Sequence, residues 1–260
     1  MSTQQHRDHS PWRRVTWLSS GIRTEIATIT STRSLWLLLV IAVVSAPAVS
    51  LLVQSTSAPN NDADLVALST RGAALPLLLW AGWGAVASGG EYTRGGIAIS
   101  AVIAGSRNRL VTAKFVVAAV ISAIGSGVGS VSAAAATYAA LPADPRFGSV
   151  PGLLALSVVA AAVTVVGVAL GFLVRSASAA ALLAAGLLLA PKAAGGLLGR
   201  AQQWVTGASP ATVIREIIAA DEVAAVQRFP LGAAAGLAVV VAVAIGVAIW
   251  AATVFARRDI

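Results

Sequence analysis

The sequence predicts an all-α membrane protein with six transmembrane helices. Hydrophobic residues make up 57% of its 260 residues, charged residues only 11%, and the mean hydropathy is +0.84. These values lie far outside the range of soluble domains. Six long runs contain no acidic residue, and each is long enough to cross a bilayer as a helix. The chain is therefore expected to form one membrane domain.

The predicted spans cover residues 34–53, 72–89, 112–140, 151–174, 176–199 and 230–255. The residues before the first run are polar and lack the short apolar core and cleavage site of a signal peptide, so we expect the first run to be kept as a span. We divide the chain into a cytoplasmic tail with an interfacial amphipathic helix, residues 1–33, and a six-helix transmembrane domain, residues 34–260.

Basic residues are unevenly distributed between the two predicted sides of the membrane. Six spans place both termini on one side, together with the loops at 90–111 and near residue 175. That side carries twelve basic and four acidic residues, and the other side carries six of each, so the whole net charge of +8 lies on one side. Basic residues mark the cytoplasmic side. We therefore expect a multi-pass protein of the inner (plasma) membrane with both termini cytoplasmic, and the basic composition requires no nucleic-acid partner.

The segment before the first span, LSSGIRTEIATITSTRSLW, has the period of an amphipathic helix. Its apolar residues recur at spacings of four, four and three, at Leu18, Ile22, Ile26 and Ile29. Glu25 and most other polar residues fall largely elsewhere. Trp17 and Trp36 can anchor such a helix at the membrane surface. The alternative is a polar tail with a fortuitous period.

The stretch GEYTRGGIAISAVIAGSRNR, residues 90–109, is polar and lies between the second and third predicted spans. Glu91 and Arg94 are three residues apart, so on a helix they share a face and can pair with each other or with a partner. Gly95 and Gly96 permit a bend. The pattern predicts a short cytoplasmic helix continuous with two spans. A polar loop that only follows the positive-inside rule is the alternative.

Two further patterns predict packing. Residues 200–229 mix helix formers with charges, and Ser209 followed by Pro210 is typical of a helix cap, so we expect one or two short extracytoplasmic helices between spans five and six. Glycines spaced by four residues let helices approach closely, and with 24 glycines in the chain we expect contacts within the chain more than a dimer face. Such pairs occur at Gly125 and Gly129, Gly167 and Gly171, Gly195 and Gly199, and Gly232 and Gly236.

Several kinds of chemistry have no candidate residues. The chain has no cysteine and no phosphate-binding G-x-x-x-x-G-K-[ST] loop, and its two histidines, His6 and His9, lie in the N-terminal tail. Ion-driven carriers and intramembrane hydrolases usually need ionisable groups at depth, whereas the only charges in the predicted spans, Lys114 and Lys192, lie near span ends. We therefore predict no catalytic, cofactor-binding or metal-binding residue, and expect a conduit driven by a separate protein.

Three segments resemble permease subunits of ABC transporters of the type-2 export class, as found in actinobacteria. TEIATITSTRSLWLLL is similar to the opening E-W-T-K-L-R-S-x-R-S-x-W-W of that family. GEYTRGGIAISAVIAGSRNRLVTAKF resembles the segment after its second span, S-E-Y-R-x-G-T-I-R-x-T-L-x-x-x-P-R-R-x-x-x-x-x-K, and the terminal FARRDI resembles its usual RRD ending. The likeness covers most of the chain in span order, and the Glu91-Tyr92 segment is its most specific part.

The resemblance assigns roles to named positions. Glu25 and Arg33 match the interfacial helix of the family, and Lys114 matches the lysine that opens its third span. Four positions match the coupling helix that docks into the ATPase subunit, namely Glu91, Tyr92, Arg94 and Gly95. The chain departs from the family pattern at Ala27, Ile97, Ala98 and Ser106, which affects individual contacts.

The function that the resemblance implies is the permease subunit of an ATP-driven exporter, moving an amphiphilic substrate such as a drug, a peptide or a lipid out of the cytoplasm. Its expected partners are two copies of an ABC ATPase, a second permease that is itself or a related chain, and membrane lipid. This chain holds no cofactor, because ATP and Mg would bind the ATPase, and it is not itself an enzyme. The alternative is a non-transporting membrane partner of an ABC ATPase with an anchor, sensor or immunity role.

Overall fold

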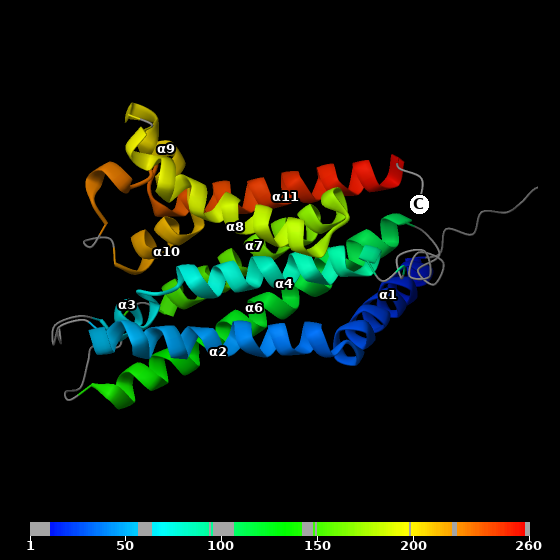
Figure 1. The fold of residues 1–260 in the computed structure, drawn as a ribbon, viewed down its shortest axis with the longest axis horizontal. Helices are drawn as coiled ribbons and strands as arrows, with labels where there is room; N and C mark the ends of the chain where they lie inside the picture. The colour runs from blue at the N-terminus through cyan, green and yellow to red at the C-terminus, as the bar shows by residue number, and fades with distance from the viewer. Residues whose placement is uncertain are drawn as a thin grey trace, which may run out of the picture.

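The computed structural model describes residues 11–56, 64–93, 95, 107–141, 148, 150–197, 199–219 and 223–257, with the side chains of 11–20, 107 and 200 left out. Every regular element in these residues is a helix, which confirms the all-α class. The long helices form an elongated bundle (Figure 1). They are α1 (Pro11–Ser31), α2 (Arg33–Thr56), α4 (Ala74–Thr93), α6 (Arg107–Ala140), α7 (Val150–Val174), α8 (Ala177–Ala194) and α11 (Ala233–Arg257).

One long helix overlaps each of the six predicted spans. Among the described residues, five helices are long and apolar enough to cross a membrane, which fits a multi-pass membrane protein; they are α2, α6, α7, α8 with the following 3-10 turn (Gly195–Leu197), and α11. Helix α4 is not among these five. It carries Trp80, Trp83, several glycines and Glu91, which lower its hydropathy. More than half of its residues are buried between other helices, and a helix enclosed in this way needs no continuous apolar surface toward lipid.

Helix α4 packs most extensively against α7, and small residues make this approach possible. A Cβ added to Gly167 or Gly171 of α7 would overlap the backbone of α4. Two hydrogen bonds cross the same interface: Ser88 Oγ donates to the Val168 carbonyl at 2.9 Å, and Thr164 Oγ1 donates to the Trp80 carbonyl at 3.3 Å. The expectation that these glycines serve packing within the chain is confirmed for this pair.

Helices α2 and α6 cover another side of α4. The Trp83 indole donates to the Leu35 carbonyl of α2 at 3.0 Å, so its polar atom is satisfied inside the bundle. Trp80 packs edge to face on Trp83 and fills the space beside Gly125 of α6, where a Cβ would overlap its ring. The predicted pair Gly125 and Gly129 on α6 therefore also packs within the chain, Gly125 against Trp80 and Gly129 against Val43 of α2.

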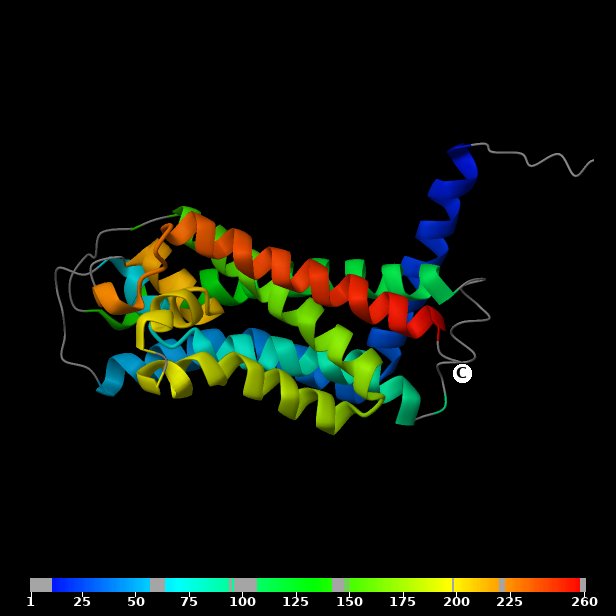
Figure 2. The same ribbon diagram turned by 90° about the horizontal axis from the view of Figure 1, so that it is seen from above.

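Helix α1 forms before the first span as predicted, and it turns away from the axis of the bundle (Figure 2). The predicted apolar face is wrong in detail. Ile22 and Ile29 pack against the core, but Ile26 is 46% exposed and Glu25 is buried at 4% exposure. A helix can bury either Glu25 or Ile26 on the same face as Ile22 and Ile29, because both spacings fit the helix period. Glu25 is the one buried, because it contacts a charged partner on α6.

The two ends of the bundle differ (Figure 1). One end holds α1, the end of α4, the start of α6, the α7–α8 turn and the end of α11. The opposite end holds α3 (Leu65–Thr70), the short helices α9 (Gln202–Gly207) and α10 (Pro210–Ile218), and the 3-10 turns Gly199–Ala201 and Ala225–Gln227. Ser209 caps α10 by accepting a hydrogen bond from the Thr212 N–H, with Pro210 in the first turn, as the sequence predicts.

Candidate functional site

A buried lysine between two buried carboxylates joins three helices at the end of the bundle that holds α1. Lys114 Nζ donates to Glu25 Oε2 of α1 at 2.8 Å and to Glu91 Oε1 of α4 at 2.6 Å. The three residues, which we call the ion triad, are each no more than 4% exposed. The Lys114 ammonium therefore connects α1, the end of α4 and the start of α6 through buried side chains.

Local packing holds each member of the ion triad in place. Lys114 lies on the same buried face of α6 as Leu110 and Val111, because these positions are three and four residues apart. Helix α1 comes close to α6 at Gly21, where a Cβ would lie 3.2 Å from the Ala113 side chain. Helix α4 continues to Thr93, past the predicted span end at residue 89, and so carries Glu91 into the bundle.

When fully ionised, the ion triad carries one positive and two negative groups. Burial disfavours the charged form of its carboxylates. Burial raises the pKa of Glu25 above its ordinary value of 4.5, and the nearby Lys114 charge opposes this rise. Glu91 Oε2 is buried and accepts no hydrogen bond from any described residue. Among the described residues, the triad is therefore held by charge and leaves one carboxylate oxygen of Glu91 without a donor. A buried polar atom in this position calls for a functional or structural reason.

An aromatic cluster continues from the ion triad toward α11. The Phe172 ring of α7 contacts the rings of Tyr92 on α4, Phe115 on α6 and Phe255 on α11, at centroid distances of 6.5, 6.0 and 5.1 Å. Tyr92 and Phe115 follow Glu91 and Lys114 directly in sequence. The same two helix ends therefore supply both the charged and the aromatic contacts, which together link four helices and α1.

The α7–α8 turn closes against this cluster. The Arg175 guanidinium lies over the Tyr92 ring, 5.6 Å from its centroid, which is cation–π geometry. Arg175 has a φ of 60°, a left-handed conformation that non-glycine residues seldom adopt. Gly89 of α4 touches the turn directly, since a Cβ there would lie 2.8 Å from the backbone of Ala177.

The predicted coupling residues are placed as follows. Glu91 and Tyr92 lie in the last turn of α4, Glu91 buried and Tyr92 half-buried. Gly95 follows with a φ of 67°, and its N–H donates to the Tyr92 carbonyl at 3.2 Å, which ends the helix. Arg94 and residues 96–106 lie outside the described residues, so the expected Glu91–Arg94 pairing and the short helix remain predictions. Arg33 is exposed at the start of α2.

The ion triad itself was missed by sequence reasoning, although two signals for it exist. Glu25 lies three residues after Ile22 and four before Ile29, so it can share their face. Lys114 is a lone charge among Leu110, Val111 and Phe115, and an ionisable residue in such a run indicates function more often than chance. Among the described residues, no group of three metal-ligating side chains occurs.

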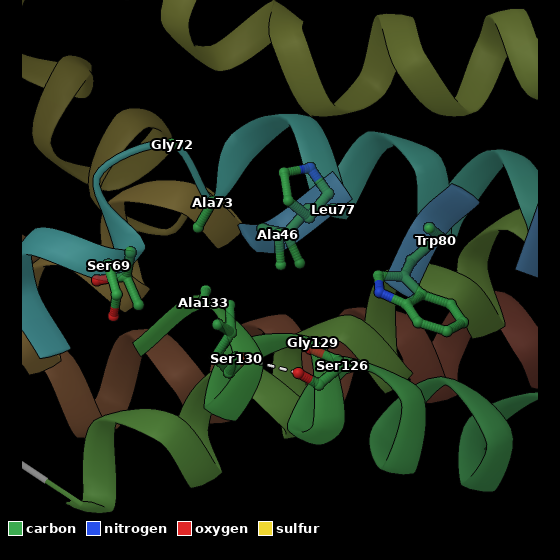
Figure 3. A pocket seen from close by; sticks show the side chains of 14 residues that line it. Ala46, Ser69, Gly72, Ala73, Leu77, Trp80, Ser126, Gly129, Ser130 and Ala133 are labelled. Carbon is green, nitrogen blue, oxygen red and sulfur yellow. Dashed lines mark hydrogen bonds between the residues drawn. The ribbon is translucent and has the colours of Figure 1, made fainter. Parts of the chain in front are cut away.

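The bundle also contains a small pocket between α2, α3, α4 and α6 (Figure 3). Its volume is about 20 Å³, room for one water molecule. Hydroxyls line it, but Ser130 Oγ donates to the Ser126 carbonyl at 2.7 Å and Ser69 Oγ donates to the Val66 carbonyl at 3.0 Å, both within their own helices. This pocket is too small for a drug, a peptide or a lipid.

No family model matches the chain, and the search of curated proteins finds no match either. The case for a function therefore rests on the sequence motifs and on the geometry of the ion triad.

Proposed function

We propose that this chain is the permease subunit of an ATP-driven ABC exporter, which moves an amphiphilic substrate out of the cytoplasm with energy from a separate ATPase. The observation that carries the proposal is the ion triad. It joins α1, α4 and α6, and it includes Glu91, one of the four residues that match the coupling helix of the family that the chain resembles.

The proposed mechanism follows from the cost of separating buried charges. An ATPase that moves the stretch of residues 90–109 acts on the end of α4 and on the start of α6, because this stretch joins the two helices in sequence. Lys114 cannot leave Glu91 or Glu25 without exposing an unpaired charge to an apolar interior, which is strongly unfavourable. The ends of α1, α4 and α6 would therefore move together.

Helix α4 would carry this movement into the rest of the bundle. Gly167, Gly171 and the Ser88–Val168 hydrogen bond fix α4 against α7 along its length. Packed interfaces of this kind shift as units more readily than they deform. Movement of the bundle end that holds α1 would thus shift the helices at the opposite end, where α3, α9 and α10 lie.

The proposed topology has six spans, with α4 as the second. Its 20 residues reach about 30 Å as a helix, which matches the hydrocarbon core of a bilayer. The end with α1 is the cytoplasmic end in this proposal, because it carries the excess of basic residues. The chain has no cysteine, so single introduced cysteines test this directly. A reagent that does not cross membranes should label Gln203→Cys in intact cells and should not label Arg257→Cys.

The test of function compares two lysines. The tagged chain is purified from its native membranes, the copurifying ATPase is identified, and ATP-dependent movement of a fluorescent amphiphile is measured in vesicles. Lys114→Gln, compared at an equal amount of folded protein in the vesicles, should lose ATP-dependent movement, whereas Lys192→Gln, at an exposed position on α8, should behave like the wild type. ATP-dependent movement that survives in Lys114→Gln would refute the coupling role of the ion triad.

Two other outcomes bear on the class of protein. If no ATPase copurifies and movement is independent of ATP, the ABC permease proposal is wrong. If an ATPase binds but no amphiphile moves, the non-transporting role of anchor or sensor is supported instead.

A further inference from the structure

A cavity of about 240 Å³ lies between α4, α7, α8, α10 and α11, away from the ion triad. Its walls include Ala162 and Val166 of α7, Leu187 of α8 and Val243 of α11, and Ser209 and Pro210 line it at the start of α10. None of the described residues that line it carries a charge. This is more than ten times the volume of the pocket in Figure 3.

The chemistry of the lining selects the occupant. Among the described residues of the lining, Ser209 supplies the one hydroxyl, and that oxygen already forms a hydrogen bond with Thr212, whose Oγ1 lies 2.8 Å away. A water molecule needs two or more polar partners, so apolar cavities of this size stay dry and take apolar ligands. The described lining side chains therefore suit an apolar ligand better than a sugar, a nucleotide or an ion.

The cavity reaches the surface of the chain beside α8 and α11, because residues of both helices that line it are largely exposed. Both helices pack against α7 but scarcely against each other. At the rim, Leu187 is 55% and Val243 is 51% exposed. Both helices are long and apolar enough to cross a membrane, so in a bilayer this rim meets hydrocarbon and not water.

We infer that the cavity is a binding site for the hydrocarbon chain of a membrane amphiphile, which enters sideways from the bilayer between α8 and α11. A polar headgroup finds no partner inside and stays outside the cavity. The inference goes beyond the proposed function, because binding requires neither an ATPase nor transport.

The experiment uses the full chain in lipid nanodiscs with a fatty acid that carries a photoreactive diazirine on its chain. After irradiation, labelled peptides are mapped by mass spectrometry, with and without excess unlabelled fatty acid. We expect saturable labelling on the cavity-facing parts of α7 and α11. Val166→Phe, which fills the cavity, should lower this labelling by about tenfold because the chain loses its apolar contacts.

The matched control is Val158→Phe, the same change at a lipid-exposed position of α7, which should leave the labelling unchanged. Val240→Phe, from the α11 wall, provides a second filling variant and should reproduce the loss. Labelling that cannot be saturated and is spread over all exposed helix faces, unchanged in both filling variants, would overturn the inference. So would protection of the cavity by a second copy of the chain, seen as a dimer that the filling variants dissociate.

Discussion

Lys114 Nζ on α6 and Glu91 Oε1 on α4 lie 2.6 Å apart inside the bundle, although 23 residues separate them in sequence. Removal of the lysine would leave two carboxylates buried without a counter-charge. We expect Lys114→Met to lower the free energy of unfolding by about 3–5 kcal/mol, as measured by tryptophan fluorescence in detergent. A loss below about 1 kcal/mol would show that the ion triad is solvated in solution.

A charge-free variant separates electrostatics from packing in this experiment. Lys114→Met combined with Glu25→Gln and Glu91→Gln removes all three charges while keeping similar volumes. Because replacement of a whole buried ion group is often close to neutral, the triple variant should regain most of the lost stability. If it is less stable than Lys114→Met alone, the charges do not account for the effect.

The raised pKa of Glu25 predicts a pH dependence of stability. The folded protein binds the Glu25 proton more tightly than the unfolded chain does, so this contribution is complete below the ordinary pKa of 4.5 and is lost as pH rises through the higher folded pKa. The Glu25→Gln variant has no titrating carboxyl at this position, so its stability does not change with pH for this reason. Thermal unfolding of both proteins between about pH 4.5 and 8 should therefore show the variant gaining on the wild type as pH rises. The opposite trend would contradict a pKa raised by burial.

Arg175 combines an unfavourable backbone conformation with a favourable ring contact. Its φ of 60° suits glycine, while its guanidinium over Tyr92 is worth about 0.5–1 kcal/mol at an exposed site. Arg175→Gly relieves the first and loses the second, so its stability should stay near that of the wild type. Arg175→Val keeps the strain without the contact and should be about 1–2 kcal/mol less stable than Arg175→Gly in the same denaturation assay. Equal stability of the two variants would argue against the turn geometry.

The contact of α4 with α7 depends on glycine at position 171. A Cβ there would overlap Ser88 Oγ and come within 2.8 Å of the Gly89 nitrogen, so Gly171→Ala should lower the free energy of unfolding by about 1–3 kcal/mol. Gly186→Ala on α8 meets no atom within 4 Å and should not lower it. The two alanine variants are compared by denaturation in the same detergent, and equal effects would refute the close packing.

Sequence patterns predicted the long helices well because hydropathy and helix period are local properties. The six predicted runs each contain a long helix, and the Ser209-Pro210 cap begins α10 as expected. The sequence patterns predicted the ends of the helices less accurately. The structure begins α6 at Arg107 and extends α4 to include Glu91. Helix α4 can continue past its apolar stretch because Glu91 finds a partner in Lys114.

The sequence by itself determined the all-α class, the apolar character of the bundle and the positions of its long helices, since each depends on residues close together in the chain. The tertiary structure alone decided which face of α1 is buried and how the ion triad forms. Ile26 and Glu25 can each share a face with Ile22 and Ile29, and local hydrophobicity favours Ile26. Glu25 is buried instead because Lys114, 89 residues away in sequence, supplies a charged partner that isoleucine cannot use.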